Sequence, residues 1–321
     1  MTARSFLRDD DLTPAEQARV LELAAALKAD PYGPQPLAGP RSVAVIFDKP
    51  TLRTQTSFSA GIAELGGHTM QVDGSLAGIG VRESVADVAR VLGRQASAIV
   101  WRTFEQSKIE EMAAHSGVPV VNALTDDFHP CQLLADLLTL VEHKGRLAGL
   151  TAAFLGDAAC NMGNSWALAG AMAGLHVRFG APEGYTPDAG VLARAGELGA
   201  TTGGSVSVHT DPVEAVAGAD VVITDTWVSM GKEDEAAARI EVFSAYAVTS
   251  ELLGHAADDA IVMHCLPAYR GKEIAAEVID GPRSVVWDEA ENRRHAQKAV
   301  LAFLAVESGL TDPSVLPDGR A

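Results

Sequence analysis

The chain has 321 residues, 47% of them apolar, which is enough for two α/β domains of ordinary size with separate hydrophobic cores. A formal net charge of −17 and the lack of any basic run disfavour nucleic acid or an anionic membrane as a partner, because phosphate backbones bind clustered Lys and Arg. The widely spaced Cys131, Cys160 and Cys265 argue against a disulfide framework and favour a reducing cytosol. The polar start of the chain, and the lack of an apolar run of about 20 residues, favour a soluble cytoplasmic protein.

Strand and helix patterns alternate through the first half of the chain. Thr13, Pro14 and Glu16 have the spacing of an N-cap, a first-turn proline and a capping box, so a helix is predicted to begin at Pro14. Apolar runs and helical periodicity then predict strands over 42–47, 68–73, 98–104 and 119–124, and helices over 56–67, 85–95 and 133–145.

The polar, glycine-containing segment 143–150 follows a long helix, so we place a domain boundary there, between 1–145 and 146–290. After it, the pattern predicts strands over 151–157, 176–182, 221–227 and 260–267, helices over 161–175, 211–220 and 291–309, and a loop over 228–239. The alternation predicts an α/β fold with two domains, each a parallel sheet flanked by helices.

Polar side chains follow these predicted strands at their carboxyl ends, where open parallel sheets bind ligands. One by one they have ordinary explanations, such as a surface arginine, a histidine that caps a helix or a core cysteine. Their recurrence at successive strand ends instead favours a binding site. The residues are Arg53, Thr54, Arg102, Thr103, His129, Gln132, Asp157, Asn161, Asp225, Ser229 and Cys265.

The segment "TLRT", Thr51 to Thr54, lies where a strand gives way to a helix. A helix N-terminus with backbone N–H groups, two hydroxyls and a guanidinium can hold a phosphate without a glycine-rich loop. Arg102 and His129, on neighbouring strands, are predicted to contact the uncharged end of the same ligand.

In the second half, Asp225 can pair with a cationic amine. Asn161 and the backbone at Ser229 and Met230 can take an α-amino acid head group. An anionic ligand in one domain and a cationic one in the other suggests group transfer.

The motifs "TLRT", "WRTF", "HPCQ", "GDAACNM", "DTWVSMG", "HCLP" and "ENRRHAQKA" occur in this order over nearly the whole chain. With this set the chain resembles the aspartate/ornithine carbamoyltransferase family, and "DTWVSMG" with "HCLP" resembles its ornithine branch. The resemblance implies carbamoyl transfer from carbamoyl phosphate to the side-chain amine of L-ornithine, giving L-citrulline and phosphate. The same residues serve arginine biosynthesis and the reverse, catabolic reaction.

The resemblance also implies which residues bind. Domain 1–145, with the closing helix at about 291–309 packed back on it, would bind carbamoyl phosphate through Thr51, Leu52, Arg53, Thr54, Arg102, His129, Gln132 and Arg293. Domain 146–290 would bind ornithine through Asn161, Asp225, Ser229, Met230, Cys265 and Leu266. The family needs no metal or organic cofactor, and it forms homotrimers, or multiples of them, in which a loop of the neighbouring subunit completes the phosphate site.

The implied chemistry agrees with the residue types. An amine attacks a carbamoyl carbon only in its neutral form, and Asp225 with Cys265 would orient it. Arg102, Thr54 and His129 would stabilise the oxyanion of the tetrahedral intermediate, at about 3 kcal/mol for each preorganised donor, and Arg53 the departing phosphate.

Two positions depart from the family pattern. Gln55 stands where the family has a second arginine, and Gly78 stands where the ornithine branch has a glutamine supplied across the subunit interface. We hypothesise that Arg82 replaces one of these contacts. Because the other basic residues remain, namely Arg53, Arg102, His129 and Arg293, we expect activity.

Other functions stay open at this point. The acceptor could be another amine, putrescine or an N-acylated ornithine, or the chain could be a carbamoyl-phosphate-binding protein without turnover. An aspartate acceptor is disfavoured, because Asp225 would repel its second carboxylate. A nicotinamide dehydrogenase is disfavoured because "GLTAAFLGDAACNMG" lacks the Gly-x-Gly-x-x-Gly spacing.

Overall fold

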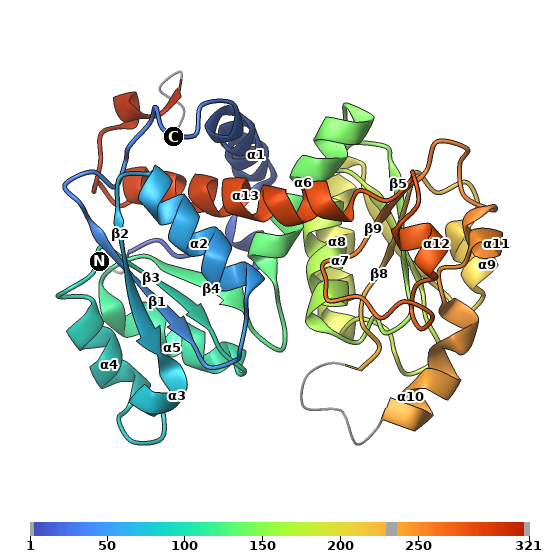
Figure 1. Ribbon diagram of the computed structural model, residues 1–321, viewed down its shortest axis with the longest axis horizontal. Coiled ribbons are helices and arrows are strands. Elements are labelled where there is room, and N and C mark those ends of the chain that lie inside the picture. Colours follow the sequence, from blue (N-terminus) through green and yellow to red (C-terminus); the bar gives the residue numbers. More distant parts are fainter. Residues whose placement is uncertain (1–2, 229–235, 318–321) are drawn as a thin grey trace. The chain divides into compact units, whose positions relative to one another are not determined.

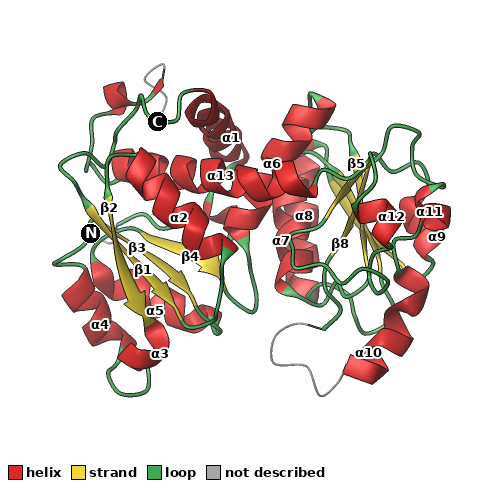
Figure 2. Cartoon of the chain, viewed as in Figure 1, coloured by secondary structure: helices red, strands yellow, loops and turns green. Residues whose placement is uncertain are grey.

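The computed structural model describes residues 3–228 and 236–317. The chain forms two compact units: the first unit is Met1–Leu138 with Glu291–Ala321, and the second unit is Thr139–Ala290. Each unit contains a parallel β-sheet with helices packed against it (Figures 1 and 2), which confirms the predicted fold class. The chain passes from one unit to the other within two helices: α6 contains the boundary between Leu138 and Thr139, and α13 contains the boundary between Ala290 and Glu291.

The sheet of the first unit has the strand order β2-β1-β3-β4, with all neighbours parallel. The inner residues of β1, from Val43 to Ile46, are 0% exposed, as expected for a strand covered on both faces. Its elements are α1 (Pro14–Ala29), β1 (Ser42–Phe47), α2 (Arg53–Glu64), β2 (His68–Asp73), α3 (Gly74–Ala77), α4 (Val85–Leu92), β3 (Ala98–Arg102), α5 (Gln106–Ser116), β4 (Val120–Leu124) and the start of α6 (Pro130–Lys144).

Helix α1 begins as the sequence predicts. The Thr13 hydroxyl accepts from the Glu16 N–H at 3.3 Å, and the Glu16 carboxylate accepts from the Thr13 N–H at 2.8 Å. This reciprocal pair satisfies backbone donors that have no partner inside the helix, and it confirms the capping box.

The C-terminal helix α13 (Val286–Glu307) packs on the first unit, alongside α2 (Figure 1). Lys298 is fully buried, and its ammonium donates to the Glu64 carboxylate at 2.7 Å and to the Leu27 carbonyl at 2.8 Å. Burial lowers the pKa of Lys298, while Glu64 acts in the opposite direction. The long reach of this lysine therefore joins α13 to both α1 and α2.

The sheet of the second unit has the order β7-β6-β5-β8-β9, again parallel throughout. Within residues 3–228 and 236–317, we find no helix that combines the length and the apolar composition of a membrane span. The elements are β5 (Thr151–Leu155), α7 (Asn161–Met172), β6 (His176–Gly180), α8 (Ala189–Thr202), β7 (Ser205–His209), α9 (Pro212–Val216), β8 (Val221–Thr224), α10 (Ala236–Phe243), α11 (Ser250–Leu253), β9 (Ile261–Met263) and α12 (Ala276–Ile279).

Some predicted boundaries are wrong. The predicted loop 228–239 ends in helix, because residues 236–239 begin α10 in an alanine-rich run of strong helix formers. The predicted helix 211–220 stops at Val216, close to Gly218, whose φ of +64° is incompatible with a right-handed helix. Helices α3, α5, α8, α11 and α12 and strand β7 lie where the sequence pattern predicts no helix or strand.

Both sheets have a switch point, where the chain leaves two adjacent strands in opposite directions. In the first unit it lies between β1 and β3, and in the second between β5 and β8. The loops after such strands diverge and leave room for a ligand. The two switch points therefore mark where functional side chains are expected.

Candidate functional site

One hydroxyl organises the switch point of the first unit. The oxygen of Thr54, 0% exposed, accepts from the Arg102 guanidinium at 3.2 Å and from the Arg293 guanidinium at 2.8 Å. Arg102 is the last residue of β3 and pairs with Phe47 at the end of β1, while Arg293 comes from α13. Three segments far apart in sequence thus meet at one side chain.

The turn before α2 prepares its N-terminus. The Thr51 hydroxyl accepts from the Thr54 N–H at 3.3 Å, and Leu52, 74% exposed, is the N-cap residue but makes no side-chain cap. Arg53 is the first helical residue, so the predicted basic turn is part of the helix rather than separate from it. The N-terminal N–H groups of a helix carry partial positive charge and favour an anion.

His129 lies directly before α6, at the end of the connection from β4, and is 3% exposed. Burial, together with the positive charges of Arg293, Arg102 and Arg53, holds the pKa of His129 well below its ordinary value. Its imidazole is therefore neutral at pH 7 and can donate one hydrogen bond. We call Arg53, Thr54, Arg102, His129 and Arg293 the cationic cluster.

Gln132 belongs to the first turn of α6 and is fully buried. Its main-chain N–H donates to the His129 carbonyl at 3.0 Å, and its side-chain amide donates to the Asp136 carboxylate at 2.8 Å. Gln132 thus lies one turn after His129, which belongs to the cationic cluster.

A cavity of about 230 Å³ opens at the carboxyl ends of β1 and β2. Thr51 and Gln55 both border it, so the position where the family pattern has a second arginine faces open space. The lining residues are Phe47, Asp48, Lys49, Pro50, Thr51, Gln55, Gln71, Val72, Asp73 and Ser75.

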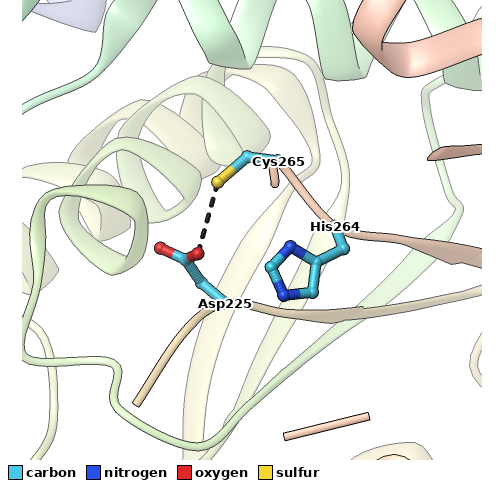
Figure 3. A group of neighbouring side chains, drawn as sticks. All are labelled: Asp225, His264 and Cys265. Carbon is cyan, nitrogen blue, oxygen red and sulfur yellow. Dashed lines mark hydrogen bonds between the residues drawn. The ribbon is translucent and has the colours of Figure 1, made fainter. Parts of the chain in front are cut away.

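In the second unit, Asp225 follows β8 and Cys265 follows β9. The Cys265 thiol donates to the Asp225 carboxylate at 3.3 Å (Figure 3). The same carboxylate oxygen accepts from the Thr226 N–H at 2.7 Å. Leu266, the next residue, has a φ of +59°, a left-handed conformation that costs a non-glycine residue roughly 1–2 kcal/mol. The structure thus brings Asp225 and Cys265 into contact, with Leu266 next to Cys265 in the chain.

Asp225, His264 and Cys265 each present a possible metal ligand atom, and these atoms lie within 4.8 Å of one another. Both ring nitrogens of His264 are already engaged, however: Nδ1 accepts from the Leu266 N–H at 2.9 Å, and Nε2 lies 3.3 Å from the Glu273 carboxylate. Binding a cation through His264 would break one of these buried contacts. The carboxylate and thiol are better suited to hydrogen bonds with an amine.

Asn161 is the first residue of α7, just beyond β5 and therefore at the switch point of the second unit. Cys160 precedes it, and burial raises the pKa of its thiol, with the charges of Asp157 and Asp225 adding to the effect. Cys160 therefore stays a thiol beside the acidic group. Ser229 and Met230 lie outside the described residues.

A buried ion pair that the sequence pattern does not indicate supports this region. Arg239 on α10 pairs with Asp157 at the end of β5 and donates to the Trp227 carbonyl at 2.5 Å. Its guanidinium also lies over the rings of Tyr185, at 5.6 Å, and Phe243, at 5.3 Å. The sequence signal for such a pair is Asp157 itself, an aspartate that follows an apolar strand, because a buried carboxylate needs a cation.

Comparison with known proteins gives consistent matches over nearly the whole chain. The family model "Aspartate/ornithine carbamoyltransferase, carbamoyl-P binding domain" matches residues 4–142, and "Aspartate/ornithine carbamoyltransferase, Asp/Orn binding domain" matches residues 148–304. An ornithine carbamoyltransferase of Clavibacter michiganensis is 63% identical over 305 residues, 95% of this chain and 99% of that protein. One of Renibacterium salmoninarum is 60% identical over 309 residues, with 95% and 99% covered.

Solved structures agree with these matches. The ornithine carbamoyltransferase of Pyrococcus furiosus superposes with a TM-score of 0.90 at 42% identity, covering 94% of this chain and 96% of that one. The anabolic ornithine carbamoyltransferase of Campylobacter jejuni has a TM-score of 0.88 at 34% identity, with 94% and 98% covered.

The depressed pKa of His129 has a measurable consequence for stability. Above pH 6.5 His129 is neutral in both the folded and the unfolded chain and contributes nothing; below it, only the unfolded chain takes up the proton. The free energy of unfolding should therefore fall as the pH drops, by about 1 kcal/mol between pH 7.5 and 5.5 for this group. Urea unfolding of the wild type and of His129→Asn at both pH values measures the difference.

The variant is expected to lack this part of the pH dependence, and His115→Asn, at an exposed histidine, is expected to retain it. An identical pH dependence in the wild type and His129→Asn would contradict the assignment of a neutral His129.

Proposed function

The chain belongs to the aspartate/ornithine carbamoyltransferase family, and we propose that it transfers the carbamoyl group of carbamoyl phosphate to the side-chain amine of L-ornithine. The products are L-citrulline and phosphate. The observation that carries the proposal is the chemical contrast between two switch points: three arginines and a neutral histidine in the first unit, and a carboxylate bonded to a thiol in the second. The first suits a phosphate dianion and the second an amine.

We assign the phosphate to the N-terminus of α2, where Arg53 and the hydroxyl of Thr51 lie beside the first backbone N–H groups. Thr54 directs Arg102 and Arg293 through its hydroxyl, and a guanidinium, with five N–H donors, is suited to binding an anion through two parallel hydrogen bonds. The match of residues 4–142 to a carbamoyl-phosphate-binding domain supports this assignment.

We assign the binding of the carbamoyl end of the ligand to Arg102, Thr54 and His129. During transfer the amine nitrogen forms a bond to the carbamoyl carbon, and the carbonyl oxygen gains negative charge. The carbon–oxygen bond to phosphate then breaks, and the amine proton leaves with the phosphate. Donors held in place before the reaction stabilise the oxyanion by about 3 kcal/mol each.

We assign ornithine to the second unit, where Asp225 and Cys265 receive its side-chain amine and Asn161 its head group, with Ser229 and Met230 as predicted partners. A carboxylate favours a basic group at this place and repels an acidic one. This selects ornithine over aspartate. Putrescine lacks the α-carboxylate and N-acylated ornithine lacks the free α-amine, so both lose head-group contacts.

We further propose a cytoplasmic homotrimer that acts in arginine biosynthesis. The structural relative of Campylobacter jejuni is described as anabolic, which supports the direction. Leu76, in α3, and Val81, in the loop that follows it, are 80% and 89% exposed, and a subunit interface would bury such apolar side chains.

Citrulline formation by the purified protein tests the function. With carbamoyl phosphate present, ornithine is expected to give a kcat/KM at least about a hundredfold above that of putrescine, N-acetylornithine or aspartate, because each rival leaves polar groups of the site unpaired. Asp225→Asn should lower kcat/KM for ornithine about a hundredfold and leave the KM for carbamoyl phosphate unchanged.

The matched control is Asp258→Asn, at an exposed aspartate of the same unit, which is expected to behave as the wild type. Binding of carbamoyl phosphate without turnover of any amine would favour a non-catalytic binding protein instead.

We assign to Arg82 the role of the glutamine that the ornithine branch has in place of Gly78. Gly78 has a φ of +63°, and the Arg82 main-chain N–H donates to the Gly78 carbonyl at 2.7 Å, so the backbone of Arg82 lies next to the position where the ornithine branch has a glutamine. We propose that Arg82 supplies its charge to the phosphate site of a neighbouring copy. Arg82→Ala should then raise the KM for carbamoyl phosphate about tenfold, the loss of one charge-assisted hydrogen bond.

The control is Arg94→Ala, which removes a cation beyond α4 in the same unit and is expected to leave both KM values unchanged. An unchanged KM for carbamoyl phosphate in Arg82→Ala would refute this role.

A further inference from the structure

His264 lies in the chain between the end of β9 and Cys265, and its side chain is completely buried. The proposed chemistry nevertheless gives it no role. Its Nδ1 accepts a hydrogen bond from the Leu266 N–H at 2.9 Å, so this nitrogen carries no proton. The proton of the neutral ring then lies on Nε2, which is 3.3 Å from the Glu273 carboxylate. The ring is thus an acceptor on one side and a donor on the other.

The group that His264 accepts from belongs to a strained residue. Leu266 has a φ of +59°, the only non-glycine residue with positive φ in the described part of the chain. A left-handed leucine persists only where its surroundings hold it. The hydrogen bond to His264 Nδ1 provides such a hold directly at the strained residue.

Glu273 fixes the other side of the ring. It is 1% exposed, and the oxygen that faces His264 Nε2 also accepts from the Tyr269 N–H at 2.5 Å. The main-chain N–H of His264 donates to the carboxylate of the buried Glu289 at 2.9 Å. The turn that carries Cys265 and Leu266 is therefore fixed through the imidazole on one side and through the backbone on the other.

We propose that His264 is a positioning residue for the amine-binding site. The tautomer with its proton on Nε2, selected by Glu273, keeps Leu266 left-handed and so directs the Cys265 thiol at Asp225. This inference rests on the proposed function, because the amine received by Asp225 and Cys265 is that of ornithine.

Two substitutions separate the two sides of the ring. His264→Asn keeps an acceptor close to the position of Nδ1 but loses the contact with Glu273, whereas His264→Gln reaches the position of Nε2 and lacks the Nδ1 acceptor. We expect kcat/KM for ornithine to fall about a hundredfold in His264→Gln and less than about tenfold in His264→Asn. The dissociation constant of carbamoyl phosphate, measured without ornithine, should stay unchanged in both, because its proposed ligands belong to the first unit.

His176→Gln makes the same chemical change at the opposite end of the second sheet and is expected to leave all these values unchanged. Equal losses in the Asn and Gln variants, or an equal loss of carbamoyl phosphate binding, would overturn the positioning role, because both indicate general damage to the fold.

A second readout keeps this test separate from that of the function. The rate of Cys265 alkylation by iodoacetamide, followed by peptide mass spectrometry, depends on the turn and not on turnover. We expect a changed rate in His264→Gln and a nearly wild-type rate in His264→Asn, even if the wild type fails to use ornithine. Identical alkylation rates in all three proteins would overturn the inference.

Discussion

The rest of the proposed chemistry depends on one hydroxyl group that holds two guanidinium groups. Thr54 is fully buried, and it accepts from Arg102 on β3 and Arg293 on α13. Positive charges gathered in this way repel one another and favour an anion that all of them can contact. The same charges depress the pKa of His129, which therefore enters the site as a neutral donor. A protein with a net charge of −17 can thus hold a phosphate, because the attraction is local.

The second unit uses the same topology with opposite chemistry. Asp225 follows β8 at a switch point, as Arg53 follows β1, but its neighbour is a thiol rather than a cation. Two buried networks stabilise this arrangement: Arg239 joins the end of β5 to the segment after β8, and His264 joins the turn after β9 to Glu273. Neither Arg239 nor His264 is among the substrate-binding residues that the family resemblance implies, although His264 contacts one of them, Leu266, through its main-chain N–H.

The sequence predicts those features that depend on local pattern. Apolar runs and the capping box at Thr13 predict the parallel sheets and the start of α1, and strand ends predict that Asp225 and Cys265 lie close together. The sequence does not predict the pairing of Arg239 with Asp157, because the two residues are 82 positions apart and the polar segment before Arg239 favours a loop over a helix. The proposed role of the His264 ring depends on the positive φ of Leu266 and on the contact with Glu273. Neither feature produces a hydrophobic pattern that could be recognised in the sequence.

Calorimetric titration of carbamoyl phosphate into Thr54→Val measures how far Thr54 organises the anion site. Valine keeps the shape of the side chain but accepts no hydrogen bond, so both guanidinium groups lose their common partner. We expect a dissociation constant at least about tenfold higher than that of the wild type. Thr56→Val, at an exposed threonine of the same helix, should leave the dissociation constant unchanged. Wild-type affinity in Thr54→Val would show that the Thr54 hydroxyl does not organise the anion site.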